Sequence, residues 1–120
     1  MNKLLIEVVV ENLNNTYKEI REKFDDVESE NAVAGMIAGM NYAKGLITPK
    51  LVKIDNDKDV KKLAEILRSK GRVVERSSSR MDFKIAYSGV LEKIAKCLEK
   101  SINDGVQKAN KEMKELLKDL

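Results

Sequence analysis

The chain has 120 residues, with one cysteine, no histidine, 23 basic and 20 acidic side chains. A chain of this length buries enough surface to fold as one domain over residues 1–120. Without histidine it lacks the usual near-neutral general base, and one cysteine supports neither an intramolecular disulfide nor a Cys/His zinc site. We therefore expect a protein that is not an enzyme and that holds no metal or cofactor.

Charged residues make up 36% of the chain and aromatic residues only 4%, which is typical of long solvated helices around an aliphatic core. The longest nearly uncharged stretch, residues 31–43, is shorter than the ~18 apolar residues of a membrane-spanning helix. Glu7 interrupts the apolar start of the chain, so no signal peptide is predicted. These features predict a cytoplasmic protein with no membrane partner.

Residues 1–28 are predicted to form the first helix. Apolar side chains recur every three or four residues from Ile6 to Val27, which places them on one helix face. A competing interpretation has a strand over residues 3–11, a turn over 12–15 and a helix from Tyr17, because the first residues are rich in β formers. The apolar phase continues through residues 12–16, and this favours the continuous helix.

Residues 31–47 are predicted to form a second, largely apolar helix with Gly35, Gly39 and Ala43 on one narrow stripe. Such a helix is buried, and small residues four apart allow another backbone to approach closely. A 28-residue helix is about 42 Å long, which exceeds the dimensions of a compact monomer of this size. We therefore expect a homo-oligomer built on the first seam and the glycine stripe. Its predicted interface residues are Ile6, Val10, Leu13, Tyr17, Gly35 and Gly39.

The region after residue 47 is predicted to contain a helix between two stretches of strand. Thr48-Pro49 ends the preceding helix, because proline disfavours helical geometry in the residue before it, and residues 50–54 suit a short strand. Asn56 or Asp57 then caps a helix that ends near Lys70, with Gly71 beyond it. Residues 72–76 and 81–87 alternate like two strands joined by residues 77–80.

The predicted hairpin over residues 72–87 is the candidate binding site. Met81, Phe83, Ile85 and Tyr87 share the face that should lie on the helices, and basic residues crowd positions 68–84. Arginine binds phosphate through two parallel hydrogen bonds, and serine hydroxyls and turn amides add donors. A solubilising hairpin that protects a sheet edge would have the same composition. The predicted residues for an anionic ligand are Arg68, Arg72, Arg76, Ser77, Ser78, Ser79, Arg80 and Lys84.

Ser88 is predicted to cap a last helix of about thirty residues. The run Asn103-Asp104-Gly105 suits either a break in this helix or its continuation, and both alternatives stay open. An apolar ladder along the helix requires a partner helix. Its members are Leu91, Ile94, Leu98, Ile102, Ala109, Met113, Leu116 and Leu120.

Two acidic stretches resemble cation sites but are better explained as helix caps and solvated turns. Residues 55–59 place carboxylates at the first, third and fifth positions of a calcium loop. Val60 stands where that loop needs glycine, and Ile66 where it needs glutamate. The acidic residues at positions 25–30 precede a helix, whose N-terminus favours negative charge. No metal site is predicted at either place.

The sequence predicts a mainly α fold with a minority of β structure, in which long helices form a bundle and residues 50–87 contain a two- or three-stranded β ribbon. Residues 1–30 carry four basic and eight acidic side chains, and residues 58–84 carry nine basic and four acidic ones. This asymmetry suits either head-to-tail association or an anionic ligand at the basic end. The predicted function is a homo-oligomeric binding module that captures a nucleic acid or nucleotide. The alternative is a structural or adaptor protein with a protein partner, and the size and composition are compatible with an accessory protein of a phage or mobile element.

Overall fold

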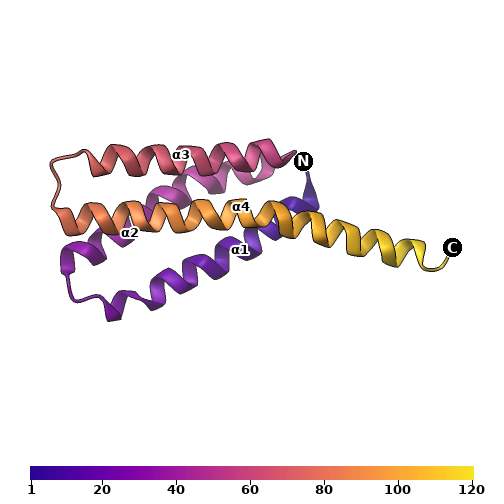
Figure 1. Cartoon of the computed structure of the whole chain (residues 1–120), viewed down its shortest axis with the longest axis horizontal. Coiled ribbons are helices and arrows are strands. Elements are labelled where there is room, and N and C mark those ends of the chain that lie inside the picture. The colour runs from indigo at the N-terminus through magenta and orange to yellow at the C-terminus, as the bar shows by residue number, and fades with distance from the viewer.

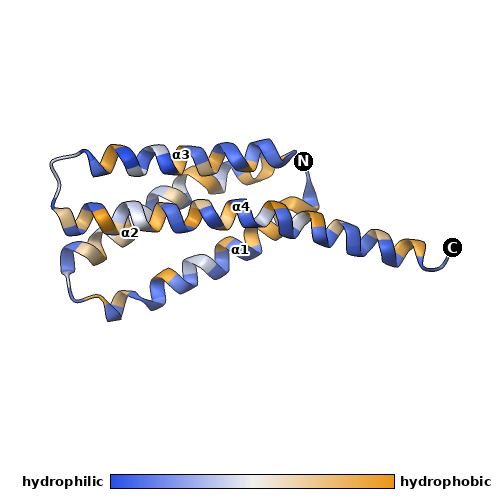
Figure 2. Cartoon of the chain, viewed as in Figure 1, coloured by the Kyte–Doolittle hydropathy of each residue, from blue (hydrophilic) through white to orange (hydrophobic).

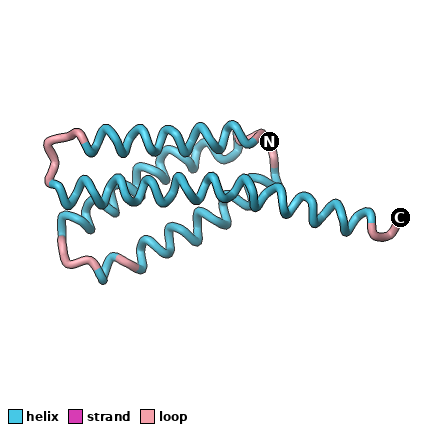
Figure 3. Tube along the Cα trace, viewed as in Figure 1, coloured by secondary structure: helices cyan, strands magenta, loops and turns pink.

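The structure is a computed structural model that describes all residues 1–120, and every regular element in it is a helix. The four long helices are α1 (Lys3–Glu22), α2 (Glu30–Ile47), α3 (Asp57–Glu75) and α4 (Met81–Leu117). Short 3-10 helices, Phe24–Asp26 and Thr48–Lys53, lie before and after α2. Figure 3 shows helices and loops with no strand. The predicted helical bundle is confirmed, and the predicted β ribbon over residues 50–87 is wrong.

α4 is the central helix of the bundle. α1, α2 and α3 each pack along α4 and contact one another much less, and Figure 1 shows α3 and α1 on either side of α4. α4 has 37 residues, whereas the other three have 18 to 20. At 1.5 Å per residue these lengths are about 55 Å and about 30 Å. α4 therefore extends past α1 and α3 at one end, and the molecule measures 61 × 27 × 19 Å.

The starts of α1, α2 and α3 are capped by side chains that the local sequence supplies. Asn2 Oδ1 accepts from the Leu5 N–H at 3.1 Å, and Ser29 Oγ accepts from the Ala32 N–H at 3.1 Å. At the start of α3, Asn56 and Asp59 each accept from the other's N–H in a capping box. The predicted cap of this helix is confirmed.

The N-terminal segment is one continuous helix through residues 12–16, as the phase of its apolar residues predicts. The helix ends at Glu22 rather than at residue 28, because residues 24–26 form a 3-10 helix and Val27 is extended. The competing strand over residues 3–11 is absent. α4 is likewise continuous through Asn103-Asp104-Gly105. Asn12 Nδ2 of α1 donates to Ser101 Oγ at 2.9 Å and to Asp104 Oδ2 at 3.0 Å. Asp104 therefore helps to join α4 to α1, and the run does not interrupt α4.

The predicted hairpin is instead the end of α3 and the beginning of α4. Residues 72–75 are the last turn of α3, residues 76–80 connect the helices, and residues 81–87 are the first two turns of α4. Phe83 and Tyr87 pack into the bundle, whereas Met81 and Ile85 are exposed. The apolar alternation over residues 81–87 thus consists of two pairs four residues apart on different faces of a helix.

Two predicted helix boundaries are wrong, because Gly71 and Ser88 both lie inside helices where α3 and α4 approach each other. Gly71 does not end α3, because it is buried inside the helix where α3 approaches Ser88 of α4. Ser88 does not begin α4, which starts seven residues earlier at Met81. The predicted strand over residues 50–54 is mostly a 3-10 helix with Pro49 in its first turn, where proline needs no N–H partner.

Candidate functional site

Arg68 is held by two carboxylates of the same chain. Its Nε donates to Glu92 Oε2 at 2.9 Å, and its Nη1 and Nη2 donate to the two oxygens of Glu99 at 2.7 Å each. These hydrogen bonds hold the pKa of both carboxyl groups below the ordinary value and raise the pKa of the guanidinium. An anionic ligand would have to displace both carboxylates, so Arg68 serves the contact between α3 and α4.

Ser77, Ser79 and Lys84 are engaged in building the turn between α3 and α4. Ser77 Oγ donates to the Val74 carbonyl at 2.6 Å, and the Ser79 N–H donates to Ser77 Oγ at 3.4 Å. Lys84 Nζ donates to the Ser77 carbonyl at 3.0 Å. These bonds satisfy backbone groups that the end of a helix leaves open.

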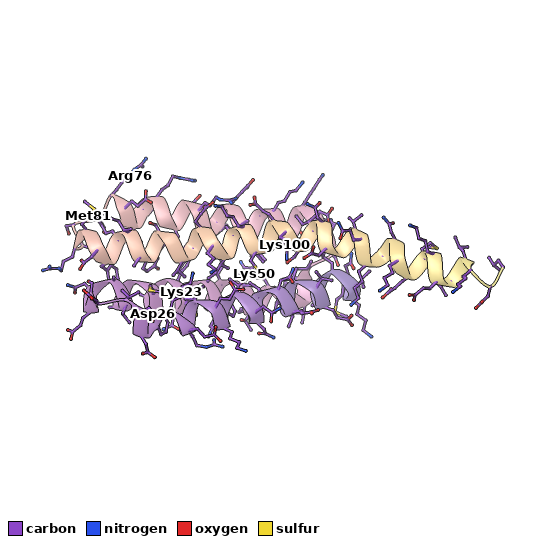
Figure 4. The ribbon with its side chains drawn as sticks, turned by 60° about the horizontal axis from the view of Figure 1, so that its bottom comes forward. Lys23, Asp26, Lys50, Arg76, Met81 and Lys100 are labelled. Atoms are coloured by element: carbon purple, nitrogen blue, oxygen red, sulfur yellow. The ribbon has the colours of Figure 1, made fainter.

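Five of the predicted ligand residues are exposed, and they are Arg72, Arg76, Ser78, Ser79 and Arg80. Figure 4 shows the Arg76 side chain directed outward at the end of the bundle where Met81 begins α4. Arg80 Nε lies 3.7 Å from Asp82 Oδ1, which is a loose and exposed ion pair. The structure therefore keeps only part of the predicted basic cluster free.

A shallow groove of about 400 Å³ runs between α3 and α4 beside these residues. Arg72 and Glu75 of α3 line one wall, and Ile85, Gly89 and Glu92 of α4 line the other. Both signs of charge therefore face the groove, and it is not a purely basic surface.

The acidic turn between α1 and α2 lies at the same end of the molecule as the basic turn. Ser29 Oγ donates to Asp82 Oδ2 at 2.6 Å, which joins this turn to the start of α4 and lowers the pKa of Asp82. Figure 4 shows Asp26 and Lys23 side by side on the α1 layer, across from Arg76. Acidic and basic turns at one end weaken the case for a single anionic ligand there.

Most of the predicted oligomer-interface residues pack against other residues of the same chain. Leu13 and Tyr17 are buried, and Ile6 and Val10 are half-buried. A Cβ on Gly35 would overlap the Phe83 carbonyl oxygen, and one on Gly39 would lie 3.0 Å from the Tyr87 carbonyl oxygen. The first seam and the glycine stripe therefore pack α1 and α2 against α4.

Two titratable groups are buried in this part of the molecule. Burial, and secondarily the charge of nearby Cys97, raise the pKa of Tyr17 to about 12. The Tyr17 hydroxyl is the one buried side-chain polar atom without a hydrogen-bond partner. Burial also raises the pKa of the Cys97 thiol, so this cysteine is not an activated nucleophile.

A series of exposed apolar residues lies at the end of the chain that extends beyond the bundle, which we call the overhang (residues 106–120) and which consists of the last part of α4 and the three residues after it. All of its residues except Lys108 are exposed, and Figure 2 shows apolar residues recurring along it. Val106, Met113, Leu116, Leu117 and Leu120 are between 51% and 99% exposed. The predicted ladder contained most of these residues, but periodicity alone did not indicate that they lie outside the bundle.

No protein-family model matches this chain, and no curated protein or solved structure matches it either. None of its helices combines the length and the apolar character needed to cross a membrane. No three or more His, Cys, Asp or Glu side chains are placed to hold a metal ion together. The overhang and the exposed arginines of the α3–α4 turn are two candidate interaction surfaces.

Proposed function

We propose that this protein is a non-enzymatic, self-associating structural or adaptor protein that acts through protein–protein contacts made by its overhang. One observation carries the proposal. The apolar row of α4 continues past the bundle as the exposed residues Val106, Ala109, Met113 and Leu116, and the exposed Leu120 follows the end of the helix at Leu117.

The spacing of this row distinguishes it from ordinary surface apolarity. Single exposed apolar residues are common on proteins, whereas a contiguous row is typical of an interaction surface. From Ile102 to Leu116 the row has spacings of four, three, four and three residues, which is the heptad spacing that buries one seam against another helix. Covering the row removes apolar area from water, so association is favoured.

Sedimentation velocity over a concentration series tests the proposal. We expect the wild-type chain to sediment above its 13.6 kDa monomer mass as concentration rises, and Val106→Lys to remain monomeric. Val73→Lys is the matched control, because Val73 is a similarly exposed valine on α3, away from the overhang. A wild-type chain that stays monomeric, or a Val73→Lys variant that dissociates equally, contradicts the proposal.

A second candidate function is anion binding at the α3–α4 turn. The exposed side chains of Arg72, Arg76 and Arg80 favour it, because arginine is the usual residue for phosphate recognition. We expect Arg76→Glu with Arg80→Glu to abolish any binding of a labelled single-stranded oligonucleotide in fluorescence anisotropy. The same charge change at Lys58 and Lys61 of α3 is the control, and equal losses in both double variants would indicate net charge rather than a site.

A further inference from the structure

We infer that a hollow between the 3-10 helix Thr48–Lys53 and the first turns of α3 binds a small phosphate monoester, with the phosphate among three lysine side chains and the organic part on an apolar floor. The three lysines are Lys50, Lys53 and Lys62, and we call the site the lysine hollow. No residue of the overhang or of the α3–α4 turn lines it. The inference therefore goes beyond the proposed function and does not depend on it.

Two helices of different type bring the three lysines together. Lys50 and Lys53 are three residues apart in a 3-10 helix, which has three residues per turn, so their side chains leave the helix on the same side. On α3, Asp59, Lys62 and Ile66 are three and four residues apart and share one helix face. Both sets of residues line the same hollow, so positive charges from two elements meet there.

Backbone hydrogen bonds hold the segment between the 3-10 helix and α3 in place. The Ile54 N–H donates to the Leu51 carbonyl at 3.2 Å, and the Ile54 carbonyl accepts from the Asn2 N–H at 2.8 Å. The Ile54 side chain is buried in the core of the bundle. The backbone of the lysine hollow is therefore in place before a ligand arrives, and binding has to order only the lysine side chains.

The formal charge of the lysine hollow is +2, because three lysines and one carboxylate, that of Asp59, line it. Asp59 Oδ2 accepts from the N–H groups of Asp55 and Asn56 at 2.8 and 3.2 Å. These hydrogen bonds hold the pKa of Asp59 below its ordinary value, so this carboxylate stays charged and serves the start of α3. None of the three lysines forms an ion pair within the chain.

This charge favours a phosphate monoester over other small anions. Lysine binds phosphate as a point charge, and a phosphate monoester carries about −1.5 to −2 charges at pH 7. Its charge therefore balances that of the lysine hollow, whereas a carboxylate or sulfonate with one charge balances half of it.

The volume and the floor of the lysine hollow indicate the organic part of the ligand. The volume is about 210 Å³, which is below the roughly 300–1,000 Å³ of most ligand pockets, so the organic part is small. Ile54, Leu63 and Ile66 supply apolar surface beside the lysines. Contact with this floor removes apolar area of the ligand from water. We therefore expect an ester with a ring or a short chain to bind more tightly than inorganic phosphate.

Titrations of the isotope-labelled full chain, followed by two-dimensional amide NMR spectra, test the inference with three probes. The probes are phenyl phosphate, inorganic phosphate and benzenesulfonate. We expect phenyl phosphate to cause saturable shifts of amides within residues 50–66 and to bind several-fold more tightly than either other probe. Its affinity should increase as the pH rises through about 6, where a phosphate monoester loses its second proton.

Two double variants test the lysines at an equal change of net charge. Lys53→Gln with Lys62→Gln removes one lysine from each wall and should weaken the binding of phenyl phosphate about tenfold or more. Lys58→Gln with Lys61→Gln removes two exposed lysines of α3 that do not line the hollow. This control should change the affinity by less than about twofold, because salt screens exposed charges at a distance.

Three results would overturn the inference. The first is a wild-type chain whose shifts do not saturate or lie mainly outside residues 50–66. The second is an equal loss of affinity in the two double variants, which would indicate net charge rather than a site. The third is an equal affinity for phenyl phosphate and for inorganic phosphate or benzenesulfonate, because neither the apolar floor nor the second charge would then contribute.

Discussion

The two parts of α4 have the same apolar spacing and opposite surroundings. Residues 81–105 are covered by α1, α2 and α3, and Leu91, Ile94 and Leu98 there are fully buried. The overhang continues the row, but Leu116 there is 72% exposed. The comparison shows that an apolar row indicates which face of a helix must be buried. It does not indicate whether the same chain or another chain buries that face.

The largest expected effect is the difference in stability loss between a substitution in the covered part of α4 and one in the overhang. Leu98→Ala removes a fully buried side chain and should lower the free energy of unfolding by about 2–5 kcal/mol. Leu116→Ala should change it by less than about 0.5 kcal/mol in dilute protein, because this side chain has no partner within the chain. Urea unfolding followed by circular dichroism measures both, and equal losses would contradict the comparison.

Two glycines of α2 allow a second comparison between a position packed against α4 and a position with no neighbour. Gly35→Ala should lower the free energy of unfolding by about 1–3 kcal/mol or more, since the new Cβ overlaps the Phe83 carbonyl oxygen of α4. Gly45→Ala should raise it by about 0.5–1 kcal/mol, since nothing lies within 4 Å of its Cβ position and alanine is the better helix former. Thermal unfolding of the pair measures the contrast, and a stabilised Gly35→Ala variant would contradict close packing of α2 on α4.

The carboxylates around Arg68 should make the covered part of α4 sensitive to acid. Arg68 holds the pKa of Glu92 and Glu99 below the ordinary 4.5, so the unfolded chain takes up protons first as the pH falls. Stability is therefore present above the ordinary pKa and is lost as the pH drops below it. Both carboxylates are more than 40% exposed, so the effect is modest. The free energy of unfolding should therefore fall less steeply between about pH 5 and pH 3 for Arg68→Met than for the wild type, and unfolding curves recorded at each pH measure this.

A small effect on stability is also expected at Tyr17, where α1 meets α4. Tyr17→Phe should change stability near neutral pH by less than about 1 kcal/mol, because it removes a buried hydroxyl that has no hydrogen-bond partner. In the wild type the pKa of Tyr17 is raised from 10.0 to about 12, so stability is present below pH 10 and is lost as the pH rises toward 12. Alkaline unfolding should show a smaller loss in the variant, and a large loss at neutral pH would reveal a hydrogen bond to the hydroxyl.

Much of the helical fold could be predicted from the sequence, because the relevant signals are local. The spacing of the apolar residues predicted that α1 is unbroken through residues 12–16, and Asn56 indicated the start of α3. The turn between α3 and α4 could not be placed, because residues four apart on two helix faces produce the same alternation as a strand. Gly71 is a packing glycine, and its role depends on Ser88 of another helix.

The candidate site was less accessible to sequence reasoning, because its members depend on long-range contacts. Arg68 is taken by Glu92 and Glu99, which lie 24 and 31 residues away along the chain. Nothing in the local composition distinguishes it from Arg72 or Arg76, which stay exposed. The row from Ile102 to Leu120 was visible as a ladder, but its exposure follows from the shorter lengths of α1 and α3.

Amide hydrogen exchange of the wild-type chain at high and low protein concentration tests the central claim most directly. If a second copy covers the overhang, exchange at residues 106–117 slows as the concentration rises, while exchange at residues 81–105 stays the same. An overhang whose exchange rates do not change with concentration would show that no second copy covers it, and would contradict the account.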